Sequence, residues 1–165
     1  MMDADTFAGG LWEFSLDFYA RPGISQRLIG LQDEHGVEVN LVLLCLYAGR
    51  RGYALSQADM SALRAMAALW SHEVVGPLRS ARRALKRMMT VDSRLVALRQ
   101  KTLALELEAE REMQRALAGV IPFEPGAGGE ALARGNLAIY LTDLGLADAI
   151  PLAGEFAAKT AVAGG

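Results

Sequence analysis

The sequence of 165 residues lacks what several classes of protein require. Its one cysteine, Cys45, excludes a disulfide framework within the chain and a zinc site built from several cysteines. The longest strongly apolar run, 41–48, is far shorter than the roughly 20 residues needed to cross a bilayer. No aromatic residue lies between Trp70 and Phe123, so the basic side chains there are not interleaved with rings that could stack on single-stranded nucleic acid.

Enzyme motifs are also missing. There is no Gly-x-Gly-x-x-Gly segment after a strand, no phosphate-binding loop and no nucleophile elbow. His35 and His72 are far apart in sequence, and Cys45 lies in the most apolar segment, where a thiol is normally an inert core residue. We therefore expect no catalytic residue, no metal and no cofactor, and we favour a protein that is not an enzyme.

The composition is that of a soluble globular domain. Hydrophobic residues make up 52% of the chain and charged residues 22%, with 17 basic against 19 acidic side chains. This near-neutral balance excludes a basic field over the whole protein. The beginning of the chain carries Asp3 and Asp5 where a secretory signal would be basic, so we expect a cytoplasmic protein.

Hydrophobic periodicity predicts helices throughout. Phe7, Leu11, Phe14 and Phe18 recur at spacings of four, three and four, which is typical of an amphipathic helix. Further helices are expected at 22–35, 37–51, 57–75, 77–89, 94–118 and 130–144. The segment 37–51 is apolar on all sides and belongs at the centre of the fold. The sequence thus predicts an all-α, single-domain bundle of about six or seven helices around a central apolar helix.

Glycine, proline and capping residues mark the expected helix ends. Gly36 fits a left-handed cap, Ser56 with Asp59 resembles a capping box, and Gly76-Pro77 is expected to break or kink a helix. The long helix 94–118 is expected to carry a single stripe of mostly apolar residues, which are Leu98, Thr102, Leu105, Ala109, Met113 and Ala116 or Leu117. We expect a helical core domain at 1–118, a Pro/Gly linker at 119–130, and a C-terminal helix with a frayed Ala/Gly tail of the same domain at 131–165.

One candidate metal site lies at the end of the second helix. The run Asp33-Glu34-His35 could offer two oxygens and an imidazole to a metal, with Asn40 nearby across the turn. Neighbouring residues on a helix point in different directions, so a solvated helix end is the favoured interpretation. The carboxylates of Asp33 and Glu34 nevertheless lie where the helix dipole disfavours negative charge, and a nearby cation would offset this effect.

The charged residues are segregated along the chain. Residues 1–75 carry a net charge of −4, residues 76–118 of +5 and residues 119–165 of −3. The basic side chains of one helix face account for much of the excess: Arg79, Arg82, Arg83, Lys86 and Arg87. These side chains either form a surface for phosphate, nucleic acid or an acidic partner, or they pair with the acidic first third of the chain, which we favour. The specific hypothesis is that Asp33, alone or with Asp17 or Glu34, contacts Arg79, Arg82 or Arg83. Gln32 and Asn40 would then satisfy the remaining polar groups.

Three segments together resemble a small proteobacterial family of uncharacterised helical proteins. The similar segments run over 11–23, 31–41 and 77–86, so that the resemblance covers about residues 11–87. The family has no assigned activity, and no role passes to any residue of this chain. The resemblance implies a bacterial, cytosolic origin, and it includes Gln32, Asp33, Asn40 and the arginines of 77–86 in the family's pattern.

The sequence therefore favours a non-enzymatic binding or adaptor protein that engages a protein or an anionic ligand. One alternative is a small metal-dependent or otherwise uncharacterised enzyme centred on Asp33, His35 and Asn40. The other is a nucleic-acid-associated protein that uses the basic helix 79–87, which we favour less. The candidate binding residues are Gln32, Asp33, His35, Asn40, Arg79, Arg82, Arg83, Lys86 and Arg87.

Overall fold

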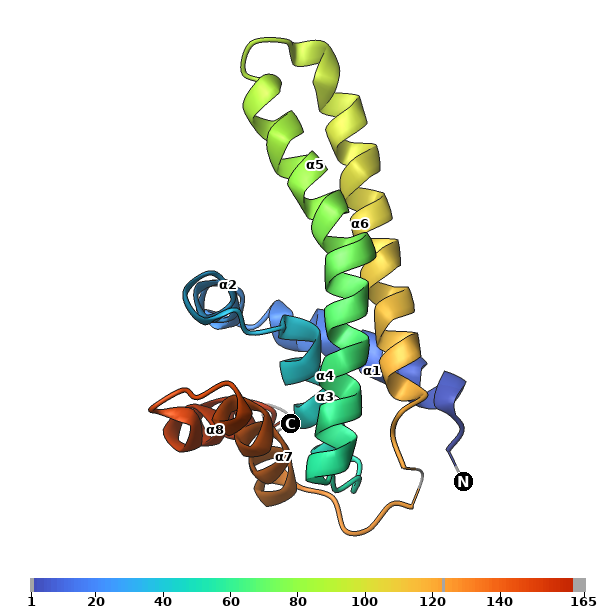
Figure 1. Cartoon of the computed structure of the whole chain (residues 1–165), viewed down its shortest axis with the longest axis vertical. Coiled ribbons are helices and arrows are strands. Elements are labelled where there is room, and N and C mark those ends of the chain that lie inside the picture. Colours follow the sequence, from blue (N-terminus) through green and yellow to red (C-terminus); the bar gives the residue numbers. More distant parts are fainter. Residues whose placement is uncertain (1, 123, 162–165) are drawn as a thin grey trace.

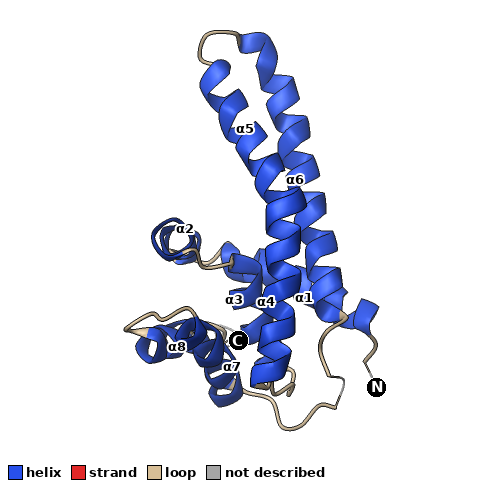
Figure 2. Ribbon diagram, in the orientation of Figure 1, coloured by secondary structure: helices blue, strands red, loops and turns tan. Residues whose placement is uncertain are grey.

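The structure, a computed structural model, describes residues 2–122 and 124–161. Its α-helices are α1 (Ala4–Tyr19), α2 (Ile24–His35), α3 (Val39–Arg50), α4 (Gln57–Trp70), α5 (Gly76–Met88), α6 (Val96–Ala118), α7 (Glu130–Asp143) and α8 (Ala149–Ala158). The described part of the chain contains no strand (Figure 2). Most helices form a globular body, and the distal parts of α5 and α6 project from it as an antiparallel hairpin (Figure 1). The predicted all-α bundle is confirmed.

Helix α3 lies in the core, as its apolar sequence predicts. All residues from Asn40 to Leu46 are buried. Helix α7 approaches α3 closely at Gly49, where an added Cβ would lie 2.3 Å from the Cα of Ala133. A glycine is needed at this position because any larger side chain would push the two helices apart.

Predicted helix ends are confirmed where local chemistry sets them. Gly36 adopts a left-handed conformation with φ 67°, and its N–H donates to the carbonyl of Gln32. The Ser56 hydroxyl accepts from the Asp59 N–H, while the Asp59 carboxylate accepts from the Ser56 N–H, which completes a capping box. These caps depend only on residues close in sequence.

Helix α4 does not break at Gly76-Pro77. A π-helical turn, Ser71–Val75, joins α4 to α5 in one continuous rod. The Gly76 N–H donates to the carbonyl of Ser71, which lies so close that a Cβ on Gly76 would be 2.3 Å from this oxygen. The extra residue of the π turn and the absence of a side chain at Gly76 let the helix continue into Pro77.

The frayed tail expected after residue 146 is wrong for the residues that the structure describes. Helix α8 packs on α7, and its buried residues are Ala149, Leu152, Ala153, Phe156 and Ala157. Thr160 is buried too, and its hydroxyl accepts from Arg50 Nε over 2.5 Å. The alanines of this segment allow the two helices to come close together. The Ala/Gly-rich composition therefore indicates close helix packing here and not fraying. The rest of the predicted tail, 162–165, lies outside the described residues.

The predicted linker 119–130 occupies the connection between α6 and α7. Its backbone is bonded to the end of α3, where the Gly126 N–H donates to the Gly52 carbonyl over 2.7 Å and the Gly129 N–H donates to the Gly49 carbonyl over 3.1 Å. The part of the segment from Gly126 to Gly129 therefore lies against the body of the protein.

The predicted buried stripe of α6 is only partly correct. Met113 and Leu117 are buried as expected, but Leu98 and Leu105 are half-exposed. Glu106, next to Leu105, is buried instead. The distal part of α6 faces only α5, so the side chains of α5 decide which residues of α6 are covered there.

Candidate ligand-binding pocket

A pocket of about 390 Å³ lies where the hairpin of α5 and α6 meets the body. Helices α1, α2 and α3 supply its other sides. Its larger apolar lining residues are Trp12, Leu16, Ile29, Val39, Leu43, Leu103 and Leu107. This volume falls within the usual range for ligand sites, which combine an apolar lining with a few polar groups.

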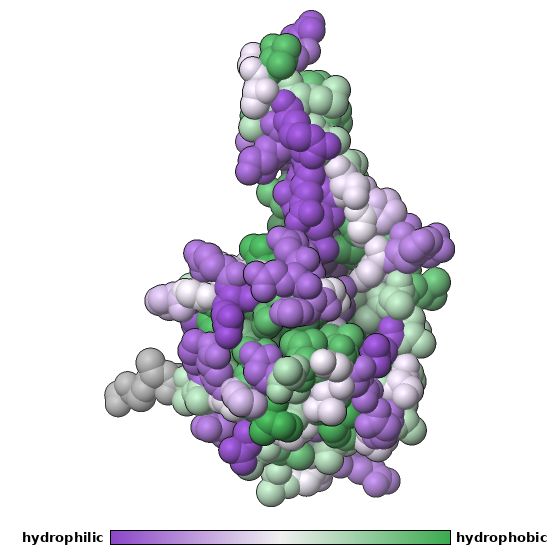
Figure 3. Space-filling model, turned by 60° about the vertical axis from the view of Figure 1, so that its left-hand side comes forward, coloured by the Kyte–Doolittle hydropathy of each residue, from purple (hydrophilic) through white to green (hydrophobic). Residues whose placement is uncertain are grey.

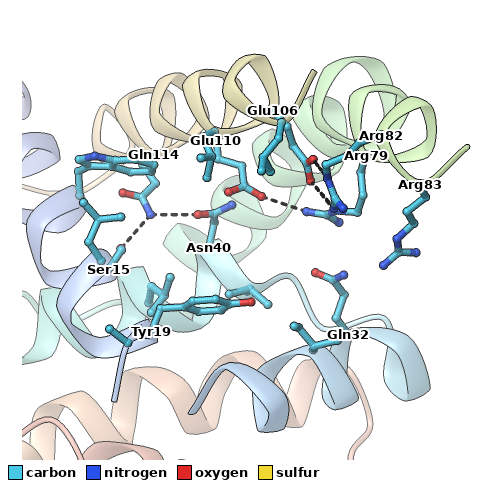
Figure 4. Close-up of a pocket in the computed structure, with 18 residues that line it drawn as sticks. Ser15, Tyr19, Gln32, Asn40, Arg79, Arg82, Arg83, Glu106, Glu110 and Gln114 are labelled. Atoms are coloured by element: carbon cyan, nitrogen blue, oxygen red, sulfur yellow. Dashed lines mark hydrogen bonds and ion pairs between the residues drawn. The ribbon is translucent and has the colours of Figure 1, made fainter. Parts of the chain in front are cut away.

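Two arginines of α5 and two glutamates of α6 form one wall of the pocket (Figure 4). Arg79 donates from Nε to Glu106 over 3.2 Å and from Nη2 to Glu110 over 3.0 Å. Arg82 donates from both Nε and Nη2 to the Glu106 carboxylate, and this bond raises the pKa of the arginine. Glu106 is only 6% exposed and holds both guanidinium groups.

Glu110 is the more exposed carboxylate of this cluster. Burial raises its pKa above the ordinary value, although the Arg79 guanidinium opposes this shift. The pKa of the Tyr19 hydroxyl is also raised, first by burial and second by the charge of Glu110. The neutral form of Glu110 is therefore more favourable in the pocket than in water. Protonation of Glu110 would weaken its ion pair with Arg79.

Buried amides connect three helices at one end of the pocket. Gln114 Nε2 donates to Ser15 Oγ over 2.9 Å and to Asn40 Oδ1 over 3.0 Å. All three residues are buried, and Asn40 Nδ2 in turn donates to Glu38. This network joins α1, α3 and α6 and fixes the shape of that end of the pocket.

Two other polar side chains extend into the pocket without partners. The hydroxyl of Tyr19 and the carboxamide of Gln32 point into it in Figure 4. Neither side chain makes a hydrogen bond to another residue in the part of the chain that the structure describes. They are available to a ligand together with Arg83, which lines the same pocket and is 51% exposed.

The structure brings some of the sequence-predicted residues together and separates others. Five of the nine candidates line the pocket: Gln32, Asn40, Arg79, Arg82 and Arg83. The four that do not are Asp33, His35, Lys86 and Arg87. His35 is half-exposed, and its Nε2 lies 3.8 Å from Glu34 Oε2. Lys86 and Arg87 are exposed on the hairpin.

The predicted pairing of Asp33 with the arginines is correct only for Arg83. Their closest atoms are 3.9 Å apart and both side chains are more than half exposed, which makes this a weak surface contact. Arg79 and Arg82 instead pair with α6, and Asn40 bonds Gln114 and Glu38 and makes no bond to Asp33. The described residues contain no group of three or more His, Cys, Asp or Glu side chains that could hold a metal.

Sequence reasoning missed Glu106, Glu110 and Gln114. Their spacing of four residues places them on one side of α6, and this polar repeat beside a basic helix was the available signal. Their importance depends on the packing of α6 between α5 and α1, which local spacing does not reveal.

A second, smaller pocket of about 220 Å³ lies between Glu38, Ser71 and Tyr140. Three of its polar residues already bond to one another. The Ser71 hydroxyl donates to Glu38 over 2.6 Å, and the Glu38 N–H donates to the Tyr140 hydroxyl over 2.8 Å. These bonds connect the π-helical turn to the start of α3, and they leave fewer polar groups free to bind a ligand.

These observations define an all-α protein with an amphipathic pocket at the base of a projecting helical hairpin. None of the helices in the described residues has the length and apolar character that a membrane span requires. The chain belongs to the family described as "Protein of unknown function (DUF2390)", which matches residues 10–117. The match includes every residue that lines the larger pocket and excludes α7 and α8. No curated protein and no solved structure matches the chain.

Proposed function

We propose that this protein is a non-enzymatic binding protein and that the larger pocket takes an anionic ligand with an apolar body. The observation that carries the proposal is the composition of the pocket, in which an apolar lining is joined to arginines on one wall.

Charge selects an anion. Three arginines and two glutamates line the pocket, which leaves one positive charge in excess. Arg83 has only a weak contact with Asp33, so it can bind an anion at the mouth. The raised pKa of Glu110 adds to this preference for an anion. A nearby anion favours the neutral form of the Glu110 carboxyl, and the neutral form holds Arg79 less strongly. Arg79 can then bind the anion.

The rim selects an apolar body. Leu16, Ile29 and Leu107 come from three different helices, line the same pocket and are each about half-exposed. A ligand that covers them gains roughly 25 cal/mol for each Å² of apolar surface removed from water. A small hydrophilic anion would leave this surface uncovered.

Non-enzymatic binding is favoured by the nature of the lining. Neither histidine nor Cys45 is among the residues of the pocket. Ser15 is present, but its hydroxyl donates to the Leu11 carbonyl and accepts from Gln114. The described lining residues therefore include no serine–histidine or cysteine–histidine pair of the kind that activates a nucleophile.

Calorimetry with three probes that share one alkyl chain tests this proposal. Octanoate should bind at least about tenfold more tightly than octylammonium or octanol, because only octanoate satisfies Arg83 and Arg79. Arg83→Gln should remove most of this preference. Arg94→Gln is the matched control, because Arg94 lies at the exposed tip of the hairpin and pairs with Asp92. Equal binding of all three probes, or no binding of octanoate, would overturn the proposal.

A further inference from the structure

The projecting hairpin lacks an interior of its own. Helix α5 has no buried residue, and the first buried residue of α6 is Thr102. Apolar side chains remain exposed along the hairpin, among them Met88, Val91, Val96 and Leu98. Two helices alone cover little surface, and a third helix would bury the apolar residues that they leave exposed.

The side of the hairpin that faces the pocket continues beyond the pocket itself. On α6, Leu103 and Leu107 line the pocket, and the exposed Val96 precedes Leu103 by seven residues, which is about two helical turns. This spacing places all three on one face. These three apolar side chains, with the exposed Gln100 between Val96 and Leu103, form the apolar row, which extends over about 16 Å of α6 from the pocket towards the tip.

A basic row runs beside it on α5. Arg83 lines the pocket, and Lys86 and Arg87 follow three and four residues later, on the same side of the helix. No carboxylate pairs with Lys86 or Arg87 in the described part of the chain. Hydrophilic side chains run down the hairpin in Figure 3, and hydrophobic surface gathers on the body below them.

The charge of the hairpin identifies the complementary partner. Residues 83–101 contain six basic side chains and a single acidic one, Asp92, which is bonded to Arg94. A partner must therefore be acidic and must also cover the apolar row. These are the two faces of an acidic amphipathic helix.

We infer that the ligand of the pocket is presented by a protein, as an acidic amphipathic helix of about three turns that lies along α5 and α6. This inference rests on the proposed function. The apolar face of that helix covers Val96 and Leu103, its carboxylates meet Lys86 and Arg87, and its end places an apolar side chain and a carboxylate in the pocket.

Other acidic macromolecules fit this surface less well. The phosphate backbone of a nucleic acid would pair with Lys86 and Arg87 but would leave the apolar row of α6 uncovered. A flat lipid surface could reach the exposed Val91 between α5 and α6. It could not enter the pocket, because the hairpin projects far from the body (Figure 1) and the pocket is also lined by α1, α2 and α3. An acidic amphipathic helix can cover the apolar row, pair with the basic side chains and reach the pocket at the same time.

Fluorescence anisotropy with a labelled synthetic peptide of about 15 residues tests the inference. Leucines spaced three and four apart give this peptide one apolar face, and glutamates fill the other positions. The control peptide has the same residues in an order that leaves no apolar face. The first peptide should bind at least about tenfold more tightly than the control at about 150 mM salt, where surface charges are screened beyond about 8 Å.

Variants assign the binding to the hairpin. Lys86→Gln with Arg87→Gln should weaken the peptide about tenfold or more and should weaken octanoate binding by a clearly smaller factor, because both side chains lie outside the pocket and neutralisation places no negative charge beside Arg83. Val96→Ser should weaken the peptide without affecting octanoate, because it lies outside the pocket. Octanoate should displace the end of the peptide and lower its affinity.

The outcomes separate this inference from the proposed function. Binding of octanoate without binding of the peptide would overturn the inference and leave the function standing. Binding of neither would overturn both. Equal binding of the two peptides, or tighter binding of duplex DNA or of phosphatidylserine vesicles, would also overturn the inference, because charge alone would then explain the hairpin.

Discussion

Replacing Glu106 with glutamine removes the one carboxylate that holds both Arg79 and Arg82. Its side chain is 6% exposed, while those of the two arginines are 22% and 19% exposed. The substitution keeps the shape of the side chain but removes its charge. Among the described residues, Arg79 and Arg82 then have only the Glu110 carboxylate nearby. The free energy of unfolding should therefore decrease.

The loss follows from the burial of the pair. Removing one partner of a buried ion pair costs about 3–5 kcal/mol, because the other charge stays away from water without compensation. Arg79 retains its bond to Glu110 at 3.0 Å, and both arginines keep some contact with solvent. We therefore expect the lower end, about 3 kcal/mol, which corresponds to a decrease of roughly 6–12 °C in Tm for a protein of this size.

Denaturant unfolding measures this loss, and a double-mutant cycle with Arg82→Met isolates the pairwise energy. Asp33→Asn is the control, because the contact of Asp33 with Arg83 is 3.9 Å long and exposed and should contribute only about 0–1 kcal/mol. A loss below about 1 kcal/mol for Glu106→Gln, or zero coupling to Arg82, would refute the role assigned to this cluster.

Three further outcomes follow from burial and charge. Phe156→Ala should decrease the free energy of unfolding by about 3–5 kcal/mol, and a loss near zero would show that α8 does not dock. Cys45 is completely buried and burial raises the pKa of its thiol, so a thiol reagent should react with it only after unfolding; rapid reaction in native buffer would contradict this. Burial raises the pKa of Glu110, so the folded protein binds this proton more tightly than the unfolded chain does, and the free energy of unfolding should fall as pH rises from the ordinary glutamate pKa through the raised one. Glu110→Gln should flatten this part of the pH profile, and an unchanged profile would assign the dependence to another group.

The sequence by itself determined the helical class, the central helix and several helix ends. The apolar run of α3 has no polar side to turn towards water, so the sequence alone places it in the core. Gly36 and the Ser56–Asp59 pair end and begin helices through bonds within a few residues, which sequence patterns describe well. The resemblance over residues 11–87 was likewise confirmed, by the family match over residues 10–117.

Only the tertiary structure decided which charges meet. The arginines of α5 were visible in the sequence, but their partner Glu106 was hidden in a helix whose predicted stripe passed through the neighbouring Leu105. Gln114 bonds Ser15, which lies 99 positions earlier in the chain. Helix α8 was also missed, because small side chains gain their stabilisation only when a facing helix is close. Periodicity fixes the face that a helix buries, whereas the identity of the side chains opposite that face depends on how distant helices pack.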